Sequence, residues 1–213
     1  MANFQGNWRT SKEIGDHLNS NFYKYFQSLT ELPASELEKL TADLPSREVK
    51  KGDYVLKSGE ICQHTFFVDK GLLRMYSVNE DGKESIVQFA PENWMMSDRG
   101  SVYFNEPSAY FIDAIEDTKA VLIDSDFIQK ISAISAEFRV NNERILQNHV
   151  RHLQNRISLL IGANAETRYL DFIKLYPDLM LRVPQWMVAS YLGITPESLS
   201  RVRRDLAKRN FKG

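Results

Sequence analysis

The sequence predicts an α+β fold, in which a run of short strands lies between two helical portions. Three observations predict it. Short apolar strings alternate with turn signals from about Glu48 to Ile123. Apolar residues at four-three spacing run from Leu146 to Leu160. A tight pair of helices is indicated near the end of the chain.

The charge distribution separates the front of the chain from the rear. The whole chain has 213 residues, of which 43% are hydrophobic, and a net charge of −1. From Glu137 onward there are 13 Lys and Arg against 7 Asp and Glu, a net of +6, which leaves 14 and 21, a net of −7, for the front. A basic rear portion behind a neutral total is compatible with nucleic-acid binding.

Cysteine content and hydropathy exclude several classes of protein. Cys62 is the single cysteine, so an internal disulfide is impossible and we expect no iron–sulfur cluster, no metal site and no other resident cofactor. The N-terminus lacks an apolar signal core, and no apolar run reaches membrane-spanning length. We therefore expect a cytoplasmic protein without a membrane partner.

The first elements are an arm and two short helices. Residues 1–21 are polar and weakly patterned, which indicates an N-terminal arm. From Phe22 to Leu44 the apolar residues fall at helical spacing, interrupted by Pro33, and Ser35 before Glu38 resembles a capping box.

Strands are predicted next, within a domain assigned to residues 22–125. Apolar strings such as Thr65–Val68 and Leu72–Val78 are separated by turn signals such as Lys51-Gly52-Asp53. Turns at intervals of about eight to twelve residues favour a small antiparallel sandwich or barrel.

A long helix over residues 126–162 follows. Its apolar residues form an a/d seam of about two heptads: Leu146, Val150, Leu153, Ile157 and Leu160. Such a seam can be a stripe that faces the core of its own chain. The polar residues that flank it favour pairing with another helix, and we interpret it as a dimerisation helix.

The segment Pro184–Arg204 predicts a helix-turn-helix within residues 163–213. The small Ala189 allows two helices to cross closely, and Gly193 suits the left-handed corner of a tight turn. Thr195 is placed to cap a second helix that begins at Pro196. An ordinary helical hairpin with a solvated basic face is the alternative.

The second helix of this pair has a polar and basic free face, as a recognition helix requires. Arg201 can donate two hydrogen bonds to guanine, and Glu197 can accept a hydrogen bond from cytosine. Arg209 and Lys212 add charge that attracts phosphate. We predict that the following residues contact DNA: Thr195, Glu197, Ser198, Arg201, Arg203, Arg204 and Lys208.

Three stretches resemble the Crp/Fnr family, the class of the cyclic-AMP receptor protein: Lys50–Glu60, Phe66–Tyr76 and Ala189–Leu206. The resemblance implies a cyclic-nucleotide-binding-like β-roll as sensor domain and a winged-type helix-turn-helix whose wing is short or missing. By position, Glu197, Ser198 and Arg201 match the family's base-reading residues. Pro196 stands where the family often has Arg, so the operator sequence is left open.

The nucleotide-binding cassette of the family is degenerate in this chain. Ser97-Asp98 stands where Gly-Glu is found in the family, and Ser108-Ala109 stands where Arg-Ser is found. Because the arginine that pairs with the cyclic phosphate is absent, we expect no cyclic-AMP binding. The surrounding aromatic and Met side chains either line another effector pocket or fill the space of the nucleotide. The candidate pocket residues are Trp94, Met96, Asp98, Arg99, Ser108 and Tyr110.

The function predicted from these features is a dimeric, sequence-specific transcription regulator that binds double-stranded DNA. The resemblance is compatible with two further partners, RNA polymerase and an unidentified small-molecule effector. An adaptor of the cyclic-nucleotide-domain type without DNA-binding activity is the alternative. Catalytic motifs such as a phosphate loop, HExxH or a serine elbow are absent from the sequence, so we predict no enzyme.

Overall fold

The computed structural model describes residues 20–210, which form two compact units. The roll unit contains residues up to Ser77 together with Gln88–Ile145. The C-terminal unit contains Val78–Val87 and the residues from Leu146 onward. The predicted arm, residues 1–21, lies outside the described residues except for its last two.

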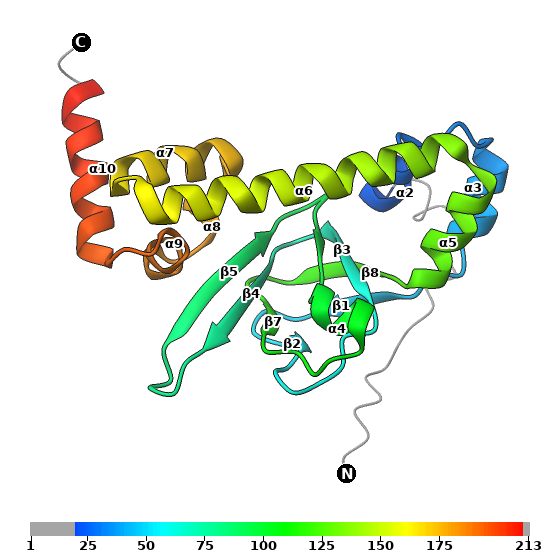
Figure 1. Cartoon of the computed structure of the whole chain (residues 1–213), viewed down its shortest axis with the longest axis horizontal. Coiled ribbons are helices and arrows are strands. Elements are labelled where there is room, and N and C mark those ends of the chain that lie inside the picture. The colour runs from blue at the N-terminus through cyan, green and yellow to red at the C-terminus, as the bar shows by residue number, and fades with distance from the viewer. Residues whose placement is uncertain (1–19, 211–213) are drawn as a thin grey trace. The chain divides into compact units, whose positions relative to one another are not determined.

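Two four-stranded sheets form the predicted antiparallel roll, which confirms the α+β fold (Figure 1). One sheet has the order β1-β8-β3-β6 and the other the order β2-β7-β4-β5. The strands are β1 (Ser46–Val49), β2 (Tyr54–Leu56), β3 (Thr65–Lys70), β4 (Leu73–Val78), β5 (Glu84–Ala90), β6 (Met95–Met96), β7 (Phe111–Ala114) and β8 (Thr118–Ile123).

Helices cover one side of the roll unit around an aromatic core. They are α2 (Asn21–Gln27), α3 (Ala34–Thr41), α5 (Ser125–Ile134) and the first part of α6 (Ala136–Gly162). Phe22 of α2 lies edge-on to Phe67 of β3 at 5.4 Å between ring centroids, and Phe26 stacks on Phe138 of α6 at 5.9 Å. The capping box predicted at Ser35 does not form, because α3 already begins at Ala34 after Pro33.

The helix predicted over residues 126–162 is divided at Ser135. This residue is extended, with φ −124° and ψ 110°, and separates α5 from α6. Its hydroxyl oxygen accepts the Phe138 N–H at 3.0 Å and the Thr30 hydroxyl at 2.8 Å. A serine that satisfies the first turn of α6 in this way favours a helix start over continuation.

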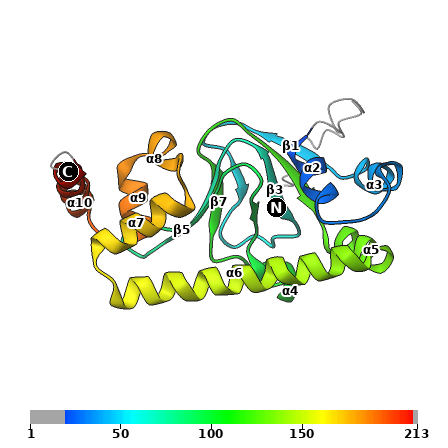
Figure 2. The ribbon, with the colours of Figure 1, turned by 90° about the horizontal axis from the view of Figure 1, so that it is seen from above.

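The C-terminal unit has four helices after α6 (Figure 2), of which α7, α9 and α10 pack against one another. They are α7 (Ala165–Leu175), α8 (Leu179–Arg182), α9 (Gln185–Leu192) and α10 (Pro196–Asn210). Their core contains three aromatic rings, Phe172, Tyr176 and Tyr191, with centroids 5.3–5.9 Å apart. Residues 211–213 lie outside the described part, so the predicted short wing stays a prediction.

Among the described residues, no helix is both long enough and apolar enough to cross a membrane.

Candidate nucleic-acid interface

The turn between α9 and α10 has the predicted geometry. Gly193 is left-handed, with φ 65° and ψ 36°, and its N–H donates to the Ser190 carbonyl at 3.1 Å. The Ile194 N–H donates to the Ala189 carbonyl at 3.0 Å. A Cβ at Gly193 would lie 3.3 Å from Leu160 Cδ2, so both conformation and space favour glycine.

Thr195 caps the start of α10. Its Oγ1 accepts the Ser198 N–H at 3.2 Å, and its hydroxyl also lies 3.2 Å from Ser198 Oγ. The pKa of the Glu197 carboxyl is lowered by a hydrogen bond from its own backbone N–H and by one from the Thr195 side chain. A carboxylate in the first turn is therefore held in its charged form at neutral pH.

One face of α10 is anchored and the opposite face is open. Leu199 is fully buried against the other helices. Ser198 and Arg203 are half-buried, whereas the remaining predicted contact residues on this helix are exposed. Those exposed residues follow helical spacing along one stripe, and we call them the α10 stripe: Glu197, Arg201, Arg204 and Lys208.

Two basic residues at the end of the chain differ from the stripe. Arg209 forms an ion pair with Glu166 of α7, which joins the end of α10 to another helix of its own unit. The phosphate role expected for Arg209 stays a prediction. Lys212 lies outside the described residues.

Arg168 of α7 holds the ends of two helices, a role the sequence analysis missed. Its guanidinium donates to the carbonyls of Leu160 at 2.9 Å, Ala163 at 3.1 Å and Leu192 at 3.1 Å. The last carbonyls of a helix lack partners within that helix. Gly162 and Gly193 mark those two ends in the sequence, and that signal could have prompted a search for a donor.

Residues 78–87 attach to the first helix of the pair within the C-terminal unit. Ser190 of α9 accepts the Ile86 N–H at 3.0 Å and donates to the Glu84 carbonyl at 3.2 Å. Arg156 of α6 donates to the carbonyls of Ile86 at 3.2 Å and Tyr191 at 3.3 Å, and its guanidinium lies 4.0 Å from the centre of the Tyr191 ring. These contacts fix α9, against which α10 packs.

The apolar seam predicted on α6 is open to solvent in the single chain. The exposed fractions are 41% for Val150, 41% for Leu153, 56% for Ile157 and 37% for Leu160. Leu146 is half-buried. Side chains this exposed do not form a core-facing stripe within the single chain.

The six residues predicted for an effector pocket have structural contacts in the roll unit. Asp98 caps α4 (Arg99–Phe104) by accepting the N–H groups of Gly100 at 3.0 Å and Ser101 at 3.4 Å. The buried Ser108 donates to the Tyr110 carbonyl at 3.2 Å, and Arg99 lies over the ring of Tyr103 at 4.7 Å. Met96 is buried opposite Phe66, and the carbonyl of Trp94 accepts the Val68 N–H at 2.9 Å.

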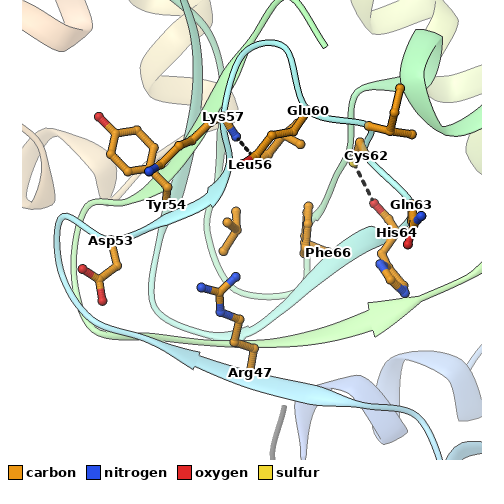
Figure 3. Close-up of a pocket in the computed structure, with 12 residues that line it drawn as sticks. Arg47, Asp53, Tyr54, Leu56, Lys57, Glu60, Cys62, Gln63, His64 and Phe66 are labelled. Carbon is orange, nitrogen blue, oxygen red and sulfur yellow. Dashed lines mark hydrogen bonds between the residues drawn. The ribbon is translucent and has the colours of Figure 1, made fainter. Parts of the chain in front are cut away.

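A cleft elsewhere in the roll unit has a volume of about 540 Å³ (Figure 3). None of those six residues lines it, so a pocket formed by them stays a prediction. The residues that line it are Arg47, Asp53, Tyr54, Val55, Leu56, Lys57, Glu60, Ile61, Cys62, Gln63, His64 and Phe66. Within the described residues, no group of three or more His, Cys, Asp and Glu is arranged to hold a metal ion.

The fold and the α10 stripe define the class of this protein as a DNA-binding regulator with a helix-turn-helix. Comparisons with known proteins agree. The sequence model of the family described as cyclic nucleotide-binding domain matches residues 46–134. Electron transport regulator A of Shewanella oneidensis is 25% identical over 183 residues, which cover 80% of this chain and 72% of that protein.

A further relative and a solved structure are also similar to this chain. The fumarate and nitrate reduction regulatory protein of Vibrio cholerae is 24% identical, over 80% of this chain and 72% of its own length. The structure of FixK2 from Bradyrhizobium japonicum has a TM-score of 0.64 at 21% identity and covers 78% of this chain and 85% of that one. Together these comparisons support a Crp/Fnr family regulator, as the three sequence stretches predicted.

Proposed function

We propose that the protein is a homodimeric transcription regulator that reads double-stranded DNA with α10. The α10 stripe is the observation that carries this proposal. A helix whose apolar side is buried at Leu199 and whose free side is polar and basic suits insertion into the major groove.

Residues along the stripe divide between base and phosphate contacts. Glu197 and Arg201 lie toward the N-terminus of α10, the end that enters the groove first in helix-turn-helix proteins. Arg201 is proposed to donate two hydrogen bonds to guanine, and Glu197 is proposed to accept a hydrogen bond from cytosine. Arg204 and Lys208, further along the helix, are proposed to contact the phosphate backbone.

Dimerisation is proposed through the exposed seam of α6. A helix-turn-helix dimer reads two half-sites, and a two-fold axis places the same surface of both copies together. Burial of Val150, Leu153, Ile157 and Leu160 between two copies of α6 would remove their exposed apolar surface from water.

The remaining assignments rest on the sequence and on the family. Cytoplasmic location, RNA polymerase as a partner, and regulation without cyclic AMP or a resident cofactor are proposed together. Ser108 stands where a phosphate-binding arginine would be required, and its hydroxyl is used by the Tyr110 backbone. Titration calorimetry should therefore detect no micromolar binding of cyclic AMP or cyclic GMP.

Selection of bound sequences from a random double-stranded DNA pool tests the function. The expected result is an enriched motif with two-fold symmetry and half-sites one helical turn apart. Enrichment without any preferred sequence, or no retention of DNA at low salt, would favour the adaptor alternative.

Sedimentation analysis of Leu153→Lys tests the dimer. This variant places a charge in the middle of the seam and is expected to be monomeric. Leu181→Lys is the matched control, because Leu181 of α8 is 91% exposed and lies outside the seam. A wild-type protein that is monomeric at micromolar concentration would contradict the proposed interface.

A further inference from the structure

The cleft of the roll unit lies at a place that the helix-turn-helix function does not use. β1 and β2 are the end strands of the two sheets, and residues of both strands and of the loop that follows β2 line the cleft. Its volume of about 540 Å³ falls within the range of about 300–1,000 Å³ typical of small-molecule sites.

Arg47 points into this cleft from β1. Side chains alternate between the faces of a strand, and Val49 is buried while Glu48 is exposed. Arg47 therefore shares the inner face with Val49 and is half-buried there. Figure 3 shows its guanidinium rising from β1 toward Leu56, with Phe66 beside it. A planar guanidinium has the donor geometry that matches a carboxylate.

Apolar side chains form part of the wall around Arg47. Leu56 and Phe66 are buried, and Val55 is half-buried. Ile61, more than a third exposed, stands where the lining meets solvent. These side chains offer apolar contact to the body of a ligand whose charged end lies on Arg47.

Charges at the mouth restrict the charge of the ligand. Lys57 lies 5.1 Å from the centre of the Tyr54 ring, and Glu60 accepts the Lys57 N–H at 2.8 Å. Asp53 is a second carboxylate in the lining. Burial lowers the pKa of His64, so its imidazole is neutral at pH 7. The two cations and two carboxylates of the lining leave no net positive charge, which disfavours a polyphosphate.

We propose that this cleft binds a small monocarboxylate with an apolar body. The carboxylate lies on the guanidinium of Arg47, and the body packs against Leu56, Phe66 and Val55. The proposal concerns binding alone, and it stands whether or not occupancy changes the affinity for DNA.

Hexanoate, its neutral analogue hexanamide and inorganic phosphate are suitable probes. Each is titrated into the full chain without DNA and followed by amide chemical shifts. Hexanoate is expected to bind saturably with a Kd of about 1 mM or tighter, with shifts centred on residues 47–66. Hexanamide lacks the charge and phosphate lacks the apolar body, so each should bind at least about tenfold more weakly.

Two variants locate the site. Arg47→Met keeps an apolar stem and should weaken hexanoate at least about tenfold. Lys50→Met is the matched control, because Lys50 pairs with Asp117 on the surface and does not line the cleft. Val55→Phe, which narrows the cleft and leaves Arg47 in place, should also weaken binding.

Three outcomes would overturn the proposal. They are the absence of saturable hexanoate binding, equal binding of hexanoate and hexanamide, and equal loss in Arg47→Met and Lys50→Met. Far-UV circular dichroism and thermal melting show whether each variant is folded. If Arg47→Met does not fold, the comparison of Val55→Phe with wild type decides, and unchanged hexanoate affinity in that variant contradicts the site.

Discussion

One arginine of the roll unit and two of the C-terminal unit have opposite environments. In the roll unit, Arg74 of β4 is 9% exposed and forms two hydrogen bonds with Asp113 of β7, at 2.7 and 2.8 Å. In the C-terminal unit, Arg201 and Arg204 of α10 are exposed along one face. The same residue type can therefore serve the fold or a partner, and burial and pairing distinguish the two roles.

Removal of one member of the buried pair should have the largest effect. Asp113→Ala leaves the Arg74 charge buried without its carboxylate and should lower the free energy of unfolding by about 3–5 kcal/mol. Urea denaturation measures this change. The exposed Lys50–Asp117 pair provides the control, and Lys50→Ala should leave stability within the error of the measurement.

A double variant sharpens this prediction. Arg74→Met with Asp113→Leu replaces the pair by apolar side chains of similar size and should lose much less stability than Asp113→Ala alone. If the single and double variants were equally destabilised, packing at these positions rather than an uncompensated charge would be responsible.

Arg201→Ala should affect DNA recognition without affecting the fold. A bidentate contact to guanine contributes about 1–3 kcal/mol of discrimination, so affinity for the preferred site should fall by about one to two decades. Lys208→Ala should instead weaken all sequences alike and lower the slope of log K against log salt by about one per lost phosphate contact. Fluorescence anisotropy with specific and scrambled duplexes at several salt concentrations separates the two. An unchanged specific-to-scrambled ratio in Arg201→Ala would refute the assigned recognition face.

Thr195→Ala tests the cap that positions the α10 stripe. Loss of the hydroxyl that accepts the Ser198 N–H should cost about 1 kcal/mol of stability. Thr195→Ser keeps the hydroxyl and is the control. Amide hydrogen exchange in the first turn of α10 should increase in the alanine variant only, and equal exchange in both would show that the cap contributes nothing.

Acidification should produce the smallest effect, through His64 of the roll unit. Its folded pKa lies below the value of about 6.5 for an unfolded chain, because burial disfavours the charged form. The unfolded state then binds more protons, so stability falls as the pH drops from about 6.5 to the lowered folded pKa. His64→Gln should flatten this part of the curve of thermal stability against pH. An identical curve in the variant would assign the effect to another group, such as His152, whose pKa burial and Arg156 also lower.

Local patterns predicted several elements well because each depended on neighbouring residues. Thr195, Pro196 and Gly193 have conformational preferences that define a cap, a first turn and a left-handed corner wherever the flanking helices form. The break at Ser135 was missed for the complementary reason. Helical periodicity continues across it, and the Thr30 hydroxyl that supports the break comes from 105 residues away.

The sequence by itself determined the order of roll, long helix and helix-turn-helix, because apolar period and turn residues act over a few positions. It also determined which α10 side chains face away from Leu199. Only the tertiary structure decided that Arg168 closes two helix ends, that Ser190 of α9 binds residues 104 positions earlier, and that Arg47 faces a cleft. Each of these contacts joins segments distant in the chain. Their partners depend on how the elements pack, and no local pattern contains that information.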